Sequence, residues 1–80
     1  MIKTHELKVW PEFFKPLWND TKKFEVRRND RGYQVGDRLL LKEWNPEFQE
    51  YTGVMVFKRV TYILDDPALC KSGFVVMAIE

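Results

Sequence analysis

The segment KKFEVRR, residues 22–28, combines the pattern of a β-strand with the densest positive charge in the chain. From residue 23 to residue 28 apolar and charged side chains alternate, so Phe24 and Val26 share one face of a strand and the charged residues share the other. Asn, Asp, Arg and Gly at residues 29–32 are typical of a loop. This segment is therefore predicted to be a charged strand that ends in a basic loop.

Further strands are predicted after this segment. Val-Gly-Asp at residues 35–37 is a tight turn, and Asn-Pro-Glu at residues 45–47 interrupts the strand that follows it. Tyr-Thr-Gly at residues 51–53 leads into the next strand, which indicates a hairpin with a long tip. The predicted strands in this part of the chain cover residues 38–44, 54–64 and 74–79.

A strand and a short helix are predicted before the segment at residues 22–28. Residues 3–9 alternate, with His5, Leu7 and Val9 on one face. Pro11 suits the first turn of a helix, because the amide hydrogen that it lacks has no partner there. The helix is expected to end at residues 19–20 and to be bent or shortened by Pro16. The apolar residues around it are expected in the core: Trp10, Phe13, Phe14, Leu17 and Trp18.

These elements predict an α+β fold that is mainly β, with one or two short helices, the second a single turn at residues 67–71. Crossover helices between successive strands are missing, which argues against a parallel sheet. We therefore expect a small mixed or antiparallel β-barrel of five to six strands, which leaves few free edges.

Length and composition indicate one domain covering residues 1–80, because 80 residues leave no room for a second core. Hydrophobic residues make up 45% of the chain, enough for a packed core without disulfides, and Cys70 is the single cysteine. No stretch reaches the roughly 18 apolar residues of a membrane span, and the first residues lack the apolar core of a signal peptide. We expect a cytoplasmic monomer without contact with membranes.

The net charge of +1 does not indicate a nucleic-acid partner, but its distribution is uneven. Residues 1–38 carry nine Lys and Arg against six Asp and Glu, whereas residues 39–80 carry four against six. The excess lies mainly in residues 22–31, where it would attract phosphate. From charge alone, a solvated strand and loop is the simpler interpretation.

The order of these motifs resembles the ASCH group of the PUA-like superfamily. The resemblance is carried by DTKKFEVR at residues 20–27, by Val-Gly-Asp at 35–37, and by THELK at 4–8. LKEW at 41–44 and Tyr-Thr-Gly at 51–53 extend it over essentially the whole chain. Taken together, these motifs look like a family of small ASCH-like proteins, bacterial and phage, described only as a domain of unknown function.

The resemblance implies a PUA-like barrel with a cleft beside the turn from helix to strand, and binding of RNA or a nucleotide. In that cleft, Lys22 at the turn could reach a phosphate or a base carbonyl. Glu25 and Arg27 are neighbours on one strand face, so they form either a surface ion pair or the floor of a polar pocket. In such a pocket a carboxylate accepts hydrogen bonds from a base amine, and a guanidinium grips phosphate.

Other residues are weaker candidates. A lone histidine such as His5 is typically structural, and Trp44 could be core or could stack on a base. Arg31 and Tyr33 are further candidates for stacking. No metal site or cofactor is expected, because one histidine and one cysteine do not make a zinc site. The candidate ligand-binding residues are His5, Lys8, Lys22, Lys23, Glu25, Arg27, Arg28, Arg31 and Trp44.

Two alternatives to RNA binding remain open. Some ASCH proteins are amidohydrolases acting on acetylated cytidine, and their proposed nucleophile is a threonine where this chain has Glu25. Glu25 could instead act as a general base, with Lys22 stabilising an oxyanion, in a hydrolase of modified nucleosides. A protein-interaction module with an aromatic surface is the other alternative. Because the nucleophile is replaced, a binding module is favoured over an enzyme.

Overall fold

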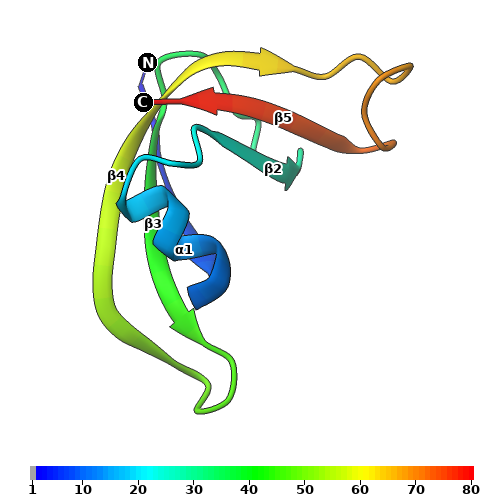
Figure 1. Ribbon diagram of the computed structural model, residues 1–80. Coiled ribbons are helices and arrows are strands. Elements are labelled where there is room, and N and C mark those ends of the chain that lie inside the picture. Colours follow the sequence, from blue (N-terminus) through cyan, green and yellow to red (C-terminus); the bar gives the residue numbers. More distant parts are fainter. Residues whose placement is uncertain (1) are drawn as a thin grey trace.

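The alternating patterns become five strands and one helix in the computed structural model, which describes residues 2–80 (Figure 1). Most boundaries lie within a residue or two of the predicted ones, although β4 begins four residues earlier and includes the Tyr-Thr-Gly segment. The elements are β1 (Thr4–Val9), α1 (Pro11–Trp18), β2 (Phe24–Arg28), β3 (Arg38–Asn45), β4 (Glu50–Leu64) and β5 (Phe74–Ile79).

The five strands form one mixed sheet in the order β1-β3-β4-β5-β2. Three pairings are antiparallel, and β1 runs parallel to β3, with Leu7 opposite Leu41. The long strand β4 holds the sheet together, because its first part pairs with β3 and the part after a register shift between Val60 and Tyr62 pairs with β5. The expected α+β, mainly β class is confirmed.

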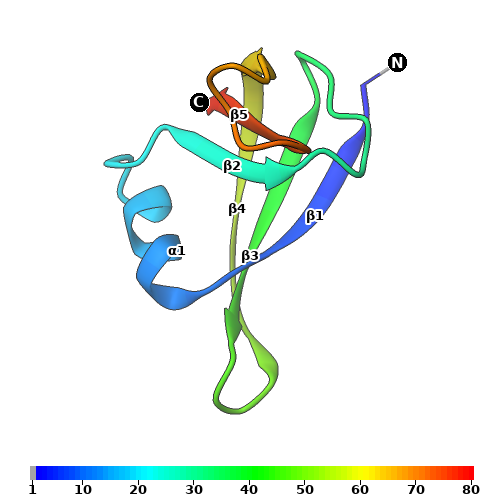
Figure 2. The same cartoon turned by 90° about the vertical axis from the view of Figure 1, so that its right-hand side faces the viewer.

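A closed barrel was expected, but the sheet does not close. Its outer strands, β1 and β2, are not paired with each other in the part of the chain that the structure describes. In Figure 2, β2 crosses at an angle to β1 and does not run alongside it. Two arginine side chains bridge the gap: Arg27 Nη2 donates to the Lys8 carbonyl at 2.9 Å and Arg31 Nη1 donates to the Glu6 carbonyl at 2.8 Å.

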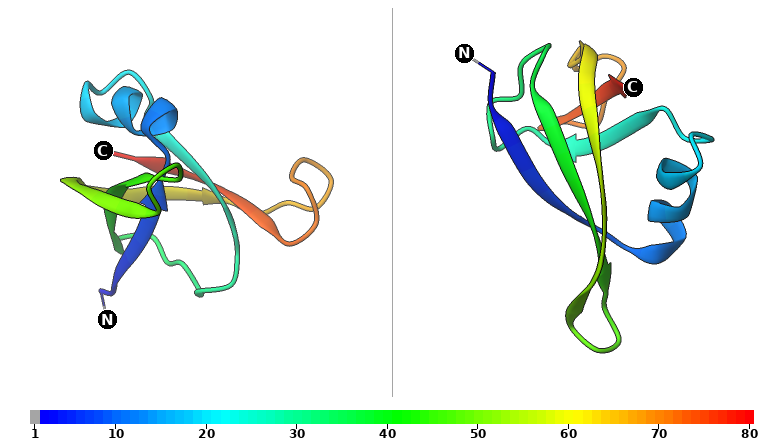
Figure 3. Two further views of the ribbon diagram at one scale, coloured as in Figure 1. Left: turned by 90° about the horizontal axis from the view of Figure 1, so that it is seen from below. Right: turned by 90° about the vertical axis from the view of Figure 1, so that its left-hand side faces the viewer.

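The core lies between α1 and the sheet, where Leu17, Leu39, Leu41 and Met77 are fully buried. Figure 3 shows α1 beside the sheet and the β3–β4 hairpin projecting beyond it. The prediction that Trp10, Phe13 and Trp18 belong to the core was wrong. A helix of eight residues has one narrow buried face, here formed by Phe14 and Leu17. The exposed fractions of the other three aromatic residues are 50% for Trp10, 54% for Phe13 and 59% for Trp18.

Two smaller expectations concern turns. Pro16 lies inside α1, which ends two residues later at Trp18, in agreement with a shortened helix. At residues 67–71 the chain forms a hydrogen-bonded turn, in which the amides of Leu69 and Cys70 donate to the Asp66 carbonyl. None of the helices among residues 2–80 is long and apolar enough to cross a membrane.

Candidate ligand-binding cleft

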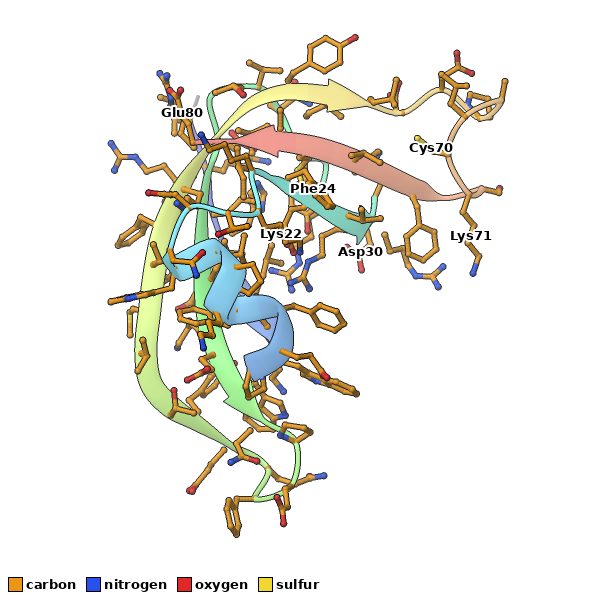
Figure 4. All side chains as sticks on the ribbon, in the orientation of Figure 1. Lys22, Phe24, Asp30, Cys70, Lys71 and Glu80 are labelled. Atoms are coloured by element: carbon orange, nitrogen blue, oxygen red, sulfur yellow. The ribbon has the colours of Figure 1, made fainter. Side chains whose placement is uncertain are left out.

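The turn between α1 and β2 determines where Lys22 lies. Asp20 adopts a positive φ of 62°, which turns the chain back at the end of the helix. The amides of Thr21 and Lys22 then both donate to the Pro16 carbonyl, at 2.9 and 3.0 Å. Figure 4 shows Lys22 at this junction, close to the start of β2. The helix end therefore fixes the backbone from which the lysine side chain extends.

Glu25 is the buried residue of β2, with 3% of its surface exposed. The alternation of faces was predicted correctly: Phe24 and Val26 lie on the opposite face from Glu25 and are exposed, at 48% and 49%. Both carboxylate oxygens of Glu25 have cationic partners: Lys22 Nζ donates to Oε1 at 3.0 Å and Arg27 Nε donates to Oε2 at 2.6 Å. The three residues form a part-buried ion-pair cluster on the inner face of the strand.

This cluster is part of the lining of a cleft of about 470 Å³, a volume typical of small-molecule sites. The cleft lies where β1 and β2 fail to pair and where α1 begins. Three cations and one carboxylate face it, which leaves an excess of positive charge. Its lining residues are Lys8, Val9, Trp10, Phe13, Lys22, Glu25, Val26 and Arg27.

Two exposed aromatic rings, Trp10 and Phe13, also line the cleft. Sequence reasoning missed both, because it placed them in the core. Helical spacing provides no signal for Phe13, because Phe13 and Leu17 are four residues apart and lie only about 40° apart around the helix. The Lys22 ammonium lies 5.8 Å from the Phe13 ring centroid and 5.3 Å from that of Phe24. The cleft therefore combines cations with aromatic surface.

Lys8 extends from this cleft to a second aromatic group. Its Nζ lies 3.9 Å from the ring centroid of Trp44, which is half-buried, and 6.0 Å from that of Tyr51. Trp44 and Tyr51 are opposite each other in the β3–β4 pairing, and their rings meet edge to face at 4.9 Å. Trp44 is thus outside the fully buried core, and Lys8 connects it to the cleft.

His5 does not join the cleft. It is 7% exposed and its Nε2 lies 2.8 Å from Oδ2 of Asp37, the last residue of the Val-Gly-Asp turn. Asp37 also accepts hydrogen bonds from the amides of Lys3 and Gln34. Burial acts to raise the pKa of Asp37, but these hydrogen bonds, with that of His5 the largest, outweigh it and leave the pKa below its ordinary value. His5 therefore anchors the turn before β3.

The other basic candidates lie outside the cleft lining. Lys23 is exposed, and its carbonyl accepts a hydrogen bond from the Ile79 amide. The Arg28 guanidinium lies 5.0 Å from the Phe74 ring centroid, and Arg31 bridges to β1. Tyr33 was a candidate for stacking, but it is 6% exposed and packs edge to face against His5. Burial raises the pKa of Tyr33.

The chemistry available in the cleft is recognition of an anion together with a flat ring. Cations at Lys8, Lys22 and Arg27 can bind phosphate, and Glu25 retains lone pairs that can accept from an amine. No group of three or more His, Cys, Asp or Glu among residues 2–80 is arranged to hold a metal ion.

The comparisons with known proteins identify a family without a described activity. Residues 4–79 match the family model described as "Domain of unknown function (DUF3850)". A relative, the "Uncharacterized 12.9 kDa protein in GpA 3'region" of Escherichia phage P2, is 37% identical over 65 residues. The match covers 81% of this chain and 58% of the relative, so the chain spans little more than half of that protein's length.

Proposed function

We propose that this chain, which belongs to the family described as Domain of unknown function (DUF3850), binds single-stranded RNA or a nucleotide in the cleft around Lys22, Glu25 and Arg27. One observation carries the proposal: three cations, a buried carboxylate and two exposed aromatic rings converge on one cleft. A nucleotide offers a matching set of groups, namely a phosphate, an amine or carbonyl edge, and a flat base. The resemblance of the sequence motifs to ASCH domains of the PUA-like superfamily implies RNA binding and adds separate support, although the sheet is not the closed barrel that the resemblance implies.

Each group in the cleft has a role in this proposal. Arg27 presents a planar guanidinium whose Nε is held by Glu25, and Lys22 and Lys8 supply point charges for phosphate oxygens. Trp10 and Phe13 offer rings on which a base can stack, an interaction worth about 1–3 kcal/mol per base. Glu25 orients both cations and can accept from an exocyclic amine. The positive excess favours a polyanion over a neutral ligand.

The geometry favours binding over hydrolysis of a modified nucleoside. Both oxygens of Glu25 are already bonded to cations, at 3.0 and 2.6 Å. A general base must take up a proton, and Glu25 would weaken both ion pairs by doing so. Incubation with N-acylated nucleosides, followed by mass spectrometry, tests the alternative. We expect no product from the wild type; turnover that is lost in Glu25→Gln would establish the hydrolase instead.

A titration with short single-stranded RNA, read by fluorescence anisotropy, tests the binding function. We expect binding at about 50 mM salt that weakens steeply towards about 200 mM, because phosphate contacts release counterions. The double variant Lys22→Ala with Arg27→Ala should bind at least tenfold more weakly. The matched control is Arg59→Ala with Lys71→Ala, which removes the same charge from exposed residues outside the cleft lining. Absence of binding by the wild type at low salt overturns the proposal.

A further inference from the structure

We propose that the aromatic pair Trp44 and Tyr51 forms a second base-binding subsite next to the cleft, so that the ligand is a single-stranded oligonucleotide of at least two nucleotides. This inference rests on the proposed function of the cleft and specifies the class of its ligand. One base would occupy the cleft and the next would stack at the aromatic pair. Lys8 links the two positions, because it lines the cleft and its ammonium lies 3.9 Å from the Trp44 ring centroid.

The aromatic pair is held by strand pairing but still accessible. Trp44 and Tyr51 are opposite each other on β3 and β4, between the Asn45–Glu50 pair and a register shift that follows Lys42. Their rings meet at an interplanar angle of 75°, so that the edge of one supports the face of the other. Tyr51 is 43% exposed and Trp44 is half-buried. Such a pair offers a base a fixed surface.

Lysine ammonium groups lie over these two rings. Lys8 lies over Trp44, and Lys42 Nζ lies 4.3 Å from the Tyr51 ring centroid. Lys42 is further held by Glu6, whose Oε1 lies 3.6 Å from its Nζ. A stacked base would replace the ammonium groups on the rings, and the two flexible lysines could then reach the phosphates on either side. Alternating cations and aromatic rings are the pattern used by single-strand binders.

The experiment compares ligands of different length on the whole chain. Adenosine monophosphate and the oligoadenylates of two and four nucleotides are titrated into the protein by calorimetry. We expect the dinucleotide to bind about 5- to 150-fold more tightly than the mononucleotide, which is the gain from one additional stacked base. Tyr51→Ala should remove most of this gain. Tyr62→Ala is the matched control, because Tyr62 is also an exposed tyrosine of β4, at 63%, outside both subsites.

The outcomes separate the two proposals. If the mononucleotide binds but length brings no gain, or if Tyr51→Ala behaves like Tyr62→Ala, the second subsite is overturned and the cleft function stands. If neither the mononucleotide nor the oligonucleotides bind, both are overturned. A circular dichroism spectrum of each variant checks that it is folded. A DNA tetramer of the same sequence serves as a further arm that shows whether the sugar contributes.

Discussion

Arg27 binds Glu25 and the strand β1 at the same time: its Nε lies 2.6 Å from the Glu25 carboxylate and its Nη2 lies 2.9 Å from the Lys8 carbonyl. The two bonds leave from different nitrogens of one planar group. The residue that would contact a phosphate is thus also a residue that joins the two outer strands of the sheet. Under the proposed function, stability and binding are therefore coupled at this position.

Replacement of Arg27 by alanine should lower both stability and affinity. Glu25 would keep one of its two cationic partners while staying buried, so we expect the free energy of unfolding to fall by about 1–3 kcal/mol in urea. The free energy of unfolding of Arg27→Lys should lie between those of the wild type and Arg27→Ala, because one ammonium cannot make both bonds in the same geometry. Arg28→Ala, next to it and exposed, should change stability by less than about 0.5 kcal/mol. A fully stable Arg27→Ala would contradict the coupling.

Glu25→Gln keeps the shape of the side chain and removes its charge. The ion pairs to Lys22 and Arg27 are lost, and we expect a loss of about 1–3 kcal/mol in the free energy of unfolding. Both cations then lack a counter-charge, so binding of RNA should become more dependent on salt, with a slope steeper by about 0.7 for one additional neutralised phosphate. The affinity at two or more salt concentrations gives this slope. An unchanged slope would show that Glu25 does not moderate the charge of the cleft.

Trp10→Ala should reduce binding without much effect on folding. Trp10 is 50% exposed and lines the cleft, so its loss removes a stacking surface worth about 1–3 kcal/mol and little core packing. Trp18→Ala provides a matched control, since Trp18 is 59% exposed at the other end of α1 and outside this cleft. Titration with RNA of both variants decides the matter: equal affinities would mean that Trp10 does not contact the ligand.

Asp37 should make the protein sensitive to acid. Its pKa is lower in the folded chain than the ordinary value of 3.8, so folding favours the charged form. The stability that it contributes is complete above that ordinary value and is lost as the pH falls through the lower folded value. We expect the melting temperature to drop between about pH 5 and pH 2. Asp37→Asn should be less stable at neutral pH and should show a shallower decline in acid. Asp65→Asn, an exposed control, should melt like the wild type throughout.

The sequence predicted the positions of the strands and the helix better than it predicted which of their side chains are buried. Alternation at residues 23–28 identified which side chains share a face of β2, but a period of two does not say which face is buried. The rule that apolar residues face inward does not hold on this strand, because Phe24 and Val26 are exposed and Glu25 is buried. The carboxylate is buried because Lys22 and Arg27 supply partners for both of its oxygens. The alternation already predicts Arg27 as a neighbour of Glu25, whereas the contact with Lys22 depends on the turn at Asp20.

The strand topology shows a second limit of prediction from the sequence. A mixed or antiparallel arrangement was expected without a place for a parallel pair, because crossover helices between successive strands are missing; the parallel pair is β1 and β3. Residues 10–37, which include α1 and β2, serve together as the long connection that a parallel pair requires. The cleft residues Lys22, Glu25 and Arg27 were predicted as a group, and the structure brings them together. His5 lies apart from them because the Val-Gly-Asp turn brings Asp37 to it.

The open edge between β1 and β2 has a consequence for how the cleft can vary. The bonds that cross it end on the carbonyl oxygens of Glu6 and Lys8, and every residue type has such an oxygen. The side chains at positions 6 and 8 can therefore be exchanged while the two arginines still hold the strands together. A substitution at position 8 can therefore change which ligand the cleft prefers, while the two arginines still join β2 and the loop after it to β1.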